Sequence, residues 1–151
     1  MLEPVTAEIA RAVVAGDLSA VRAAEGWPHD DTVDAMSMAT EPDPGPMWLI
    51  TLGGRIVGDC GTLGLPTLGE VEIGYGLAVS ARGFGYATEA AGAVCTWLFT
   101  QADVTLIGAV GVLADNRASR GVLEKLGFTV TGESDQRVSY ALTSDRLRYP
   151  P

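Results

Sequence analysis

Cysteine, histidine and basic residues are scarce in this chain of 151 residues. Cys60 and Cys95 are the only cysteines, which excludes a disulfide framework and a four-cysteine metal site, and we predict no bound metal. Both cysteines lie among apolar residues, as small core side chains do. Ten Lys and Arg residues against 19 Asp and Glu residues give a net charge of −9. This charge argues against nucleic acid or an anionic membrane as a partner.

Long apolar runs are missing too. No run approaches the ~20 residues of a membrane-spanning helix, and the first residues lack the pattern of a signal peptide. We therefore expect no membrane partner and a cytoplasmic location. With 47% hydrophobic residues, the chain is long enough to bury a sizeable core. We predict a single domain over residues 1–151.

The N-terminal third carries helix signals but no clear strand. Polar N-cap residues and glycine stops are present, namely Thr6, Asp17, Gly16 and Gly26. They predict two short helices, over residues 6–14 and 17–25, and a third helix over 31–40. A proline-rich connection over 41–46 follows. Residues 2–5 are the only candidate for an opening strand, so we expect the sheet to lose a strand at this edge.

Strand formers dominate the next part of the chain. The clearest hairpin joins residues 47–52 to 55–63 through Gly53-Gly54, because glycine readily adopts positive φ at both turn positions. A loop over 64–69 then leads to a strand over 70–79. The remaining predicted elements are a helix over 86–99, a strand buried on both faces over 104–112, a helix capped by Asp115 or Asn116 and ended by Gly127, and a hairpin of 128–132 with 136–142.

Residues 71–88 are the stretch around which the chain is organised. Their first half alternates like a strand, and Gly74 and Gly76 within it predict a bulge or a close backbone approach. The turn Arg82-Gly83-Phe84-Gly85 then leads into an alanine-rich helix. Free amide groups, the helix dipole and the Arg82 charge together favour an anion here, most often a phosphate.

Two kinds of nucleotide-binding turn fit this description. A Rossmann turn needs G-x-G-x-x-G and an acidic residue about twenty positions on. Gly83 to Thr88 lacks the third small residue, and Asp103 precedes the next predicted strand instead of ending it. The other pattern needs Arg or Gln, two free positions, Gly, one free position, then Gly or Ala. Arg82, Gly85 and Ala87 fill it.

A second segment points to the same family. Residues 115–128 read D-N-R-A-S-R-G-V-L-E-K-L-G-F, which resembles the N-x-x-S-x-x-x-L-E-K-x-G-F signature of GCN5-related N-acetyltransferases (GNAT). Residues 72–75 and 82–90 resemble the RimJ/RimL-like branch of that family, and the resemblance covers about residues 48–140. It implies an α/β fold with a mixed, mostly antiparallel sheet of about six strands. About four helices would flank this sheet, and its central parallel strands would splay apart.

The resemblance implies acetyl-CoA as the acyl donor. Its pantetheine arm would pair with the edge left free where the strands over 70–79 and 104–112 part. The glycine turn would hold the pyrophosphate, because a β-carbon there would block the phosphate oxygens. The implied cofactor-binding residues are Leu77, Val79, Arg82, Gly83, Phe84, Gly85, Tyr86, Ala87, Thr88, Asn116 and Arg120. Arg117, Arg120 and Lys125 form either a cationic patch for coenzyme A or a solvated helix face.

The same resemblance implies catalytic roles for Glu72 and Ser119. Glu72 occupies the place where family members often carry the base, although a solvent-facing carboxylate is the alternative. Many relatives carry a tyrosine where this chain has Leu123, and the RimL-like branch substitutes the serine, here Ser119, as proton donor. Ser119 could instead serve only the first helical turn. Tyr140 is either a further donor or a core aromatic with a bonded hydroxyl.

The sequence indicates the acceptor substrate less directly than the acyl donor. Trp27, His29, Asp30 and Asp31 fall in the segment that usually walls the family's acceptor site, and acidic residues there would favour a cationic amine. A lone loop histidine is, however, more often exposed than catalytic. We predict acetyl transfer to a primary amine of a small molecule or peptide, with a homodimer left open. The missing tyrosine keeps a non-catalytic acyl-CoA-binding sensor as the alternative, and a Rossmann oxidoreductase is third.

Overall fold

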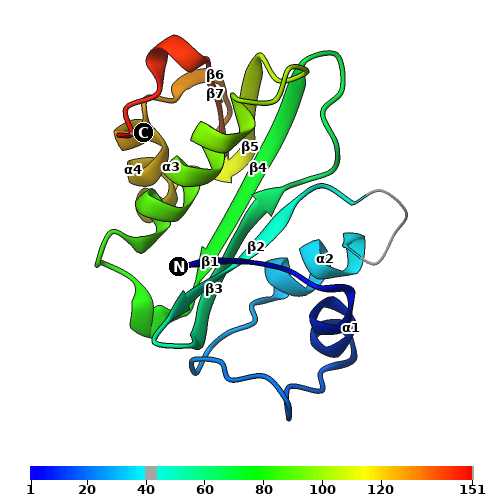
Figure 1. The fold of residues 1–151 in the computed structure, drawn as a ribbon. Coiled ribbons are helices and arrows are strands. Elements are labelled where there is room, and N and C mark those ends of the chain that lie inside the picture. The colour runs from blue at the N-terminus through cyan, green and yellow to red at the C-terminus, as the bar shows by residue number, and fades with distance from the viewer. Residues whose placement is uncertain (40–43, 151) are drawn as a thin grey trace.

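The computed structural model describes residues 1–39 and 44–150, which build a seven-stranded sheet (Figure 1). Its strands are β1 (Leu2–Pro4), β2 (Met47–Leu52), β3 (Arg55–Thr62), β4 (Glu70–Leu77), β5 (Leu106–Leu113), β6 (Thr129–Glu133) and β7 (Arg137–Leu142). They are ordered β1-β2-β3-β4-β5-β7-β6, with β4 and β5 parallel and the other neighbours antiparallel. This confirms the predicted fold class, with seven strands in place of about six.

Two pairs of helices cover the sheet. The first pair, α1 (Ala7–Ala15) and α2 (Asp30–Met38), lies on one face, and α3 (Tyr86–Leu98) and α4 (Arg117–Leu126) lie on the other (Figure 1). Thr6 caps α1 by accepting a hydrogen bond from the Ile9 amide at 3.3 Å, and Gly16 ends the helix at φ 70°. Asn116 and Gly127 cap α4 as predicted. Over the described residues, no helix has the length and apolar character needed to cross a membrane.

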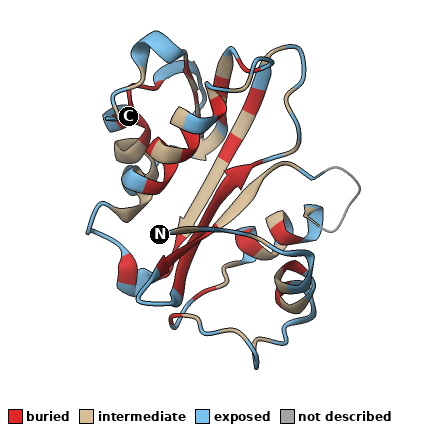
Figure 2. Ribbon diagram, viewed as in Figure 1, coloured by how far each residue is buried: buried red, intermediate tan, exposed pale blue. Residues whose placement is uncertain are grey.

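The buried residues explain this layering. In Figure 2 they run along the sheet and along the sides of the helices that face it. The largest fully buried side chains include Leu98 of α3, Leu123 and Leu126 of α4, and Ile107 and Tyr140 of the sheet. Burying these apolar groups is the main force that holds α3 and α4 against the strands.

The predicted helix over residues 17–25 is wrong. Asp17 does bond ahead as a cap would, because its Oδ1 accepts from the Ser19 amide at 3.1 Å. The chain then runs along β3, where Ala24 donates to the Ile56 carbonyl at 2.7 Å and Ile56 donates to the Arg22 carbonyl at 2.8 Å. Pairing with a strand therefore satisfies backbone groups that a local helix would have satisfied within itself.

The expected loss of an edge strand is wrong as well. Leu2, Glu3 and Pro4 pair with β2 in antiparallel register as β1. A proline is tolerated there because β1 is an edge strand. The hairpins of β2 with β3 and of β6 with β7 are confirmed. Helix α2 confirms the third predicted helix up to Met38, whereas Thr40 and residues 41–43 of the proline-rich connection lie outside the described residues.

The parallel strands β4 and β5 part after a short pairing, as predicted. They pair at Glu70–Leu106, Val71–Ile107 and Glu72–Gly108. Of the bulge or close backbone approach predicted at Gly74 and Gly76, the bulge is wrong, since β3 and β4 stay in register there. The irregularity lies on β5, between Ala109 and Val112. The later part of β5 is not buried on both faces as predicted, because Val110 is 64% exposed.

Candidate functional site

Two cavities meet where β4 and β5 part. The larger, of about 800 Å³, lies between α2 and the sheet, and the smaller, of about 400 Å³, lies between α3 and α4. Five residues line both cavities, namely Tyr75, Gly76, Arg82, Asn116 and Ser119. A group bound in one cavity can therefore reach a group bound in the other at these residues.

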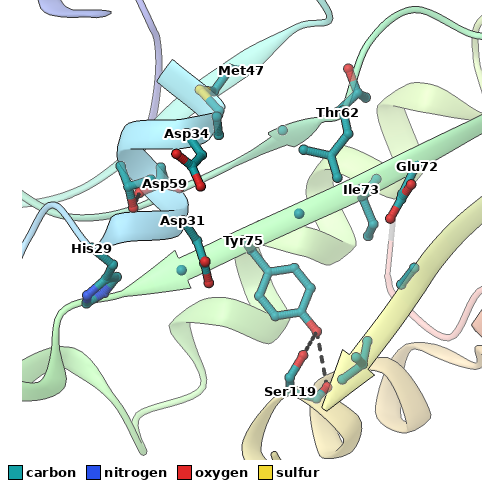
Figure 3. A pocket seen from close by; sticks show the side chains of 18 of the residues that line it. His29, Asp31, Asp34, Met47, Asp59, Thr62, Glu72, Ile73, Tyr75 and Ser119 are labelled. Carbon is teal, nitrogen blue, oxygen red and sulfur yellow. Dashed lines mark hydrogen bonds between the residues drawn. The ribbon is translucent and has the colours of Figure 1, made fainter. Parts of the chain in front are cut away.

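The larger cavity is acidic. Its carboxylates are Asp30, Asp31, Asp34, Asp59 and Glu72, against Arg82 and His29 as its basic side chains. We call it the acidic cavity. In Figure 3, Asp31 and Asp34 project from α2 toward β4. The predicted grouping of His29, Asp30 and Asp31 is thus found in one wall, and such a field attracts cations.

Glycine makes the floor of the acidic cavity. Asp59 pairs with Gly76 and Gly61 pairs with Gly74 across β3 and β4, so alternation puts all four, and Glu72, on the same face of the sheet. Gly61, Gly74 and Gly76, which we call the glycine floor, carry no side chains between Asp59 and Glu72, although Pro46 and Met47 cover Gly61, where a built β-carbon would lie 2.7 Å from the Pro46 oxygen. The two glycines that suggested a bulge instead leave room above the strand.

Asp59 is a buried carboxylate that the sequence reasoning missed. Only 5% of the residue is exposed. Its Oδ2 accepts hydrogen bonds from Trp27 Nε1 and Thr32 Oγ1, both at 2.8 Å. Burial raises the pKa of Asp59, and these two bonds and the nearby His29 oppose that shift only in part. Trp27 is absent from the described lining of the cavity and therefore affects it through its hydrogen bond to Asp59.

His29 and Arg82 converge on one carbonyl. His29 Nε2 lies 2.7 Å from the Leu77 oxygen, and Arg82 Nε donates to the same oxygen at 3.1 Å. A carbonyl only accepts, so Nε2 of His29 carries a hydrogen. Leu77 is a predicted cofactor-binding residue, and its carbonyl already has two partners within the protein.

Glu72 bridges the gap between the parting strands. Its Oε1 accepts a hydrogen bond from the Val110 amide at 3.2 Å, just beyond the last paired residues of β4 and β5. The carboxylate also lines the acidic cavity. It is therefore neither a free solvent-facing group nor isolated from the place where a substrate would bind.

The smaller cavity is basic. Arg82, Arg117 and Lys125 line it, and none of the described residues in its wall is acidic. We call it the basic cavity. Gly83 and Gly85 have φ of 84° and 87°, and a β-carbon built on either would meet no protein atom within 4 Å. Gly85 starts α3 without a side-chain cap, so glycine turn, helix dipole and cations fit an anionic ligand such as a pyrophosphate.

The predicted cofactor residues fall into two groups. Those that line the basic cavity are Leu77, Arg82, Gly83, Gly85, Ala87, Thr88 and Asn116. The others, absent from its described lining, are Val79, Phe84, Tyr86 and Arg120. Phe84 stacks on Tyr86 with ring centroids 5.8 Å apart. Arg120 donates from Nε to the Tyr140 hydroxyl at 3.0 Å and from a terminal nitrogen to the Ala114 carbonyl at 2.9 Å.

Tyr75 and Ser119 meet at the boundary of the cavities. The Tyr75 hydroxyl lies 3.1 Å from Ser119 Oγ and donates to the Ser119 carbonyl at 3.1 Å (Figure 3). Burial raises the pKa of Tyr75 to about 12, so the hydroxyl keeps its proton near neutral pH. Tyr75 belongs to residues 72–75, which carry part of the family resemblance, but the sequence alone assigned it no role. Tyr140, by contrast, is 1% exposed and bonded to Arg120, as a core aromatic would be.

Known acetyltransferases resemble this chain in sequence and in fold. The model of the Acetyltransferase (GNAT) domain family matches residues 1–129. An uncharacterized N-acetyltransferase of Bacillus subtilis strain 168, YjdG, is 40% identical over 81 residues, which are 53% of this chain and 48% of that protein. The aligned part therefore spans about half the length of this curated relative.

Solved structures share the fold. Mycobacterium smegmatis RimJ, in complex with CoA-disulfide, is 24% identical with a TM-score of 0.66, covering 95% of this chain and 81% of that chain. RimL, a ribosomal L7/L12 alpha-N-protein acetyltransferase in complex with coenzyme A, is 20% identical with a TM-score of 0.69, covering 96% and 94%. At these identities the likeness establishes the fold.

Asp59→Asn tests the cost of the buried charge. We expect the variant to be at least as stable as the wild type near neutral pH, because an amide oxygen keeps both hydrogen bonds and removes a desolvated charge. A raised folded-state pKa means that the native state binds the proton more tightly than the unfolded state does. The free energy of unfolding of the wild type therefore rises, relative to that of the variant, as pH falls toward 3.8, the ordinary pKa of aspartate. The stability difference between the two proteins shrinks accordingly.

Urea unfolding of both proteins across this pH range measures the effect. Asp103→Asn, which removes the same charge from an exposed turn, is the control and should show no such pH-dependent gain. A variant that is clearly less stable than the wild type at neutral pH would contradict the assignment of Asp59 as a costly buried charge.

Proposed function

The chain belongs to the GNAT acetyltransferase family, and we propose that it transfers an acetyl group from acetyl-CoA directly to a primary amine. One observation carries the proposal. A cation-lined cavity that suits an anionic cofactor opens into an acid-lined cavity that suits an ammonium group, and Tyr75 and Ser119 stand where they meet. Holding two reactants in contact is itself a large part of catalysis.

Acetyl-CoA would lie in the basic cavity. Arg82, Arg117 and Lys125 would neutralise its phosphates, and Gly83 and Gly85 would admit the pyrophosphate close to the backbone. When bound, it would supply the thioester that an amine can attack. RimJ and RimL, which share this fold, were solved with forms of coenzyme A. Val79, Phe84, Tyr86 and Arg120 stay predicted cofactor contacts.

The amine would enter through the acidic cavity. It arrives mostly protonated at neutral pH, so it must lose a proton before it can attack. We assign that proton to Glu72, directly or through water, because its carboxylate lines the cavity beside the gap in the sheet. The hydrogen bond from Val110 fixes the carboxylate and still leaves lone pairs to accept a proton.

The departing thiolate would receive a proton from Ser119. The Tyr75 hydroxyl keeps its own proton and holds Ser119 through contacts of 3.1 Å to both Oγ and the carbonyl. In this assignment Ser119 takes the part that the missing tyrosine at Leu123 plays in many relatives, and Tyr75 is its positioning residue. A cytoplasmic location, a single domain and a homodimer stay predictions.

Turnover separates this proposal from a non-catalytic acyl-CoA sensor. Incubation with acetyl-CoA and a panel of primary amines should release free thiol only when an amine is present. A protein that binds acetyl-CoA by calorimetry but releases no thiol with any amine would be the sensor.

The first prediction concerns the glycine turn. Gly85→Ala should weaken acetyl-CoA binding at least ~tenfold, because its methyl group enters the space that the phosphates need, and about nine of every ten complexes are then lost at limiting ligand. A left-handed alanine also costs about 1–2 kcal/mol of stability. Gly16→Ala is a matched control, since Gly16 has φ 70°, has no protein atom within 4 Å of a built β-carbon, and lies at the end of α1. Equal affinities of the two variants in calorimetry would refute the phosphate site.

The second prediction concerns the proton donor. Ser119→Ala should lower kcat by ~10²-fold or more, the usual contribution of an acid–base group, and should raise the acetyl-CoA dissociation constant far less. Tyr75→Phe should also lower kcat, by a smaller factor, whereas Tyr140→Phe should be nearly silent since its hydroxyl bonds Arg120 in the core. If Tyr140→Phe causes the larger loss, Tyr140 takes the role instead.

The third prediction concerns the base. Glu72→Gln should keep the fold and cofactor binding, because an amide oxygen can still accept from Val110, but should remove most turnover near neutral pH. The loss should shrink as pH rises, since more free amine then forms without help. Steady-state rates of the two proteins across the neutral and alkaline range measure this. A variant that matches the wild type at every pH would mean that another group accepts the proton.

A further inference from the structure

Asp59 is a buried carboxylate in the wall of the acidic cavity. Its two hydrogen-bond donors, Trp27 and Thr32, are neutral, so they solvate the carboxylate without cancelling its charge. A buried ionised group is costly unless a partner of opposite charge compensates it. His29 nearby offsets the cost of burying this charge only in part, so a bound cation can compensate it further.

The free oxygen of Asp59 faces the cavity. Both hydrogen bonds fall on Oδ2, whereas a β-carbon built on Gly76 would lie 4.0 Å from Oδ1. Gly76 lines the acidic cavity, and a β-carbon built on it would also lie 3.4 Å from His29 Cδ2 and 3.9 Å from Thr32 Oγ1, so His29 borders the space beside Asp59. Asp31 and Asp34 project from α2 over the same space (Figure 3). A cation over Gly76 would thus meet a buried carboxylate below and exposed carboxylates above.

This place is separate from the carboxylate assigned as the base. Gly76, beside Asp59, and Glu72 are four residues apart on β4, which is about 13 Å at the rise of a strand. Gly76 lines both cavities, as Ser119 and Tyr75 do, so a ligand held at Asp59 lies beside the place where the two cavities meet. One ammonium group cannot contact both carboxylates at once.

We propose that the acceptor is an elongated dication, a diamine-like molecule that anchors one ammonium group at Asp59 while its other amine reacts near Glu72 and Ser119. The proposal rests on the proposed function and names its substrate class. The glycine floor accommodates the uncharged chain between the two nitrogens. A monoamine of equal length fills the same space but leaves Asp59 uncompensated, so the difference between the two measures the anchor.

Calorimetry tests the anchor without any turnover. The protein is titrated with α,ω-diaminoalkanes from diaminopropane to diaminodecane and with the n-alkylamine of each length. We expect the diamines to bind at least ~tenfold more tightly at the best length, a difference worth about 1.4 kcal/mol, and to bind less well when shorter. Equal affinity of diamine and monoamine at every length would overturn the proposal.

Asp59→Asn locates the effect, with thiol release from acetyl-CoA as the second readout. The ratio of kcat/KM for the best diamine to that for its monoamine should fall ~tenfold or more in this variant, as the lost charge pair predicts. Asp103→Asn, on the exposed turn, should leave the ratio unchanged. If Asp59→Asn does not fold, Asp34→Asn, exposed on α2, should lower the ratio about twofold or more by the same attraction.

The two proposals fail in different ways. Diamine binding that depends on Asp59, with no thiol released from any amine, would support the anchor and refute the acetyltransferase assignment. Thiol release that is equal for monoamines and diamines would support the transferase and refute the anchor. A preference for diamines over monoamines that is unchanged in both Asp59→Asn and Asp34→Asn would also refute the anchor.

Discussion

The parting of β4 and β5 is the constraint on which the rest of the site depends. The two strands share only three paired positions, ending at Glu72 and Gly108. Beyond them, backbone groups that a continuous sheet would pair must find other partners, in side chains or in water. Glu72 satisfies the Val110 amide, and Tyr75 reaches across to Ser119 on α4. The residues that close the gap are therefore the same residues that the proposed chemistry uses.

The gap also separates charge. The chain is acidic overall, yet Arg82, Arg117 and Lys125 gather on the α3 and α4 side while five carboxylates line the α2 side. A single cavity with both signs would let the charges pair with one another. Two cavities that share only Arg82 among their charged side chains keep most of each field available, the positive one for a phosphate-bearing donor and the negative one for a cation. They meet only at a few shared residues, where donor and acceptor must touch.

Local signals predicted most of the frame, and tertiary contacts decided what they missed. Caps, the Gly53-Gly54 turn and the glycine turn before α3 act within a few residues, so the sequence contains them. Residues 17–25 carry helix signals too, but the edge of β3 at Ile56, where β4 does not pair, was a better partner for their backbone. Gly74 and Gly76 read as a bulge because pairing with β3 is invisible in one strand. In the sequence, Asp59 is only a lone acidic residue between apolar residues. It is buried because of contacts with α2, which a local sequence pattern does not contain.

The buried carboxylate links stability to function. Trp27 and Thr32 donate to Asp59 and favour its ionised form, but they do not offset the cost of burying it, so hydrogen bonding alone does not account for the charge. Burial raises the pKa of Asp59, which means that its ionised form lowers the stability of the native state near neutral pH. A glycine floor beside it adds open volume where side chains would otherwise bury apolar surface. Both features weaken the fold and both improve the same cavity as a place for a cationic chain, which is the pattern of a binding site and not of a structural core.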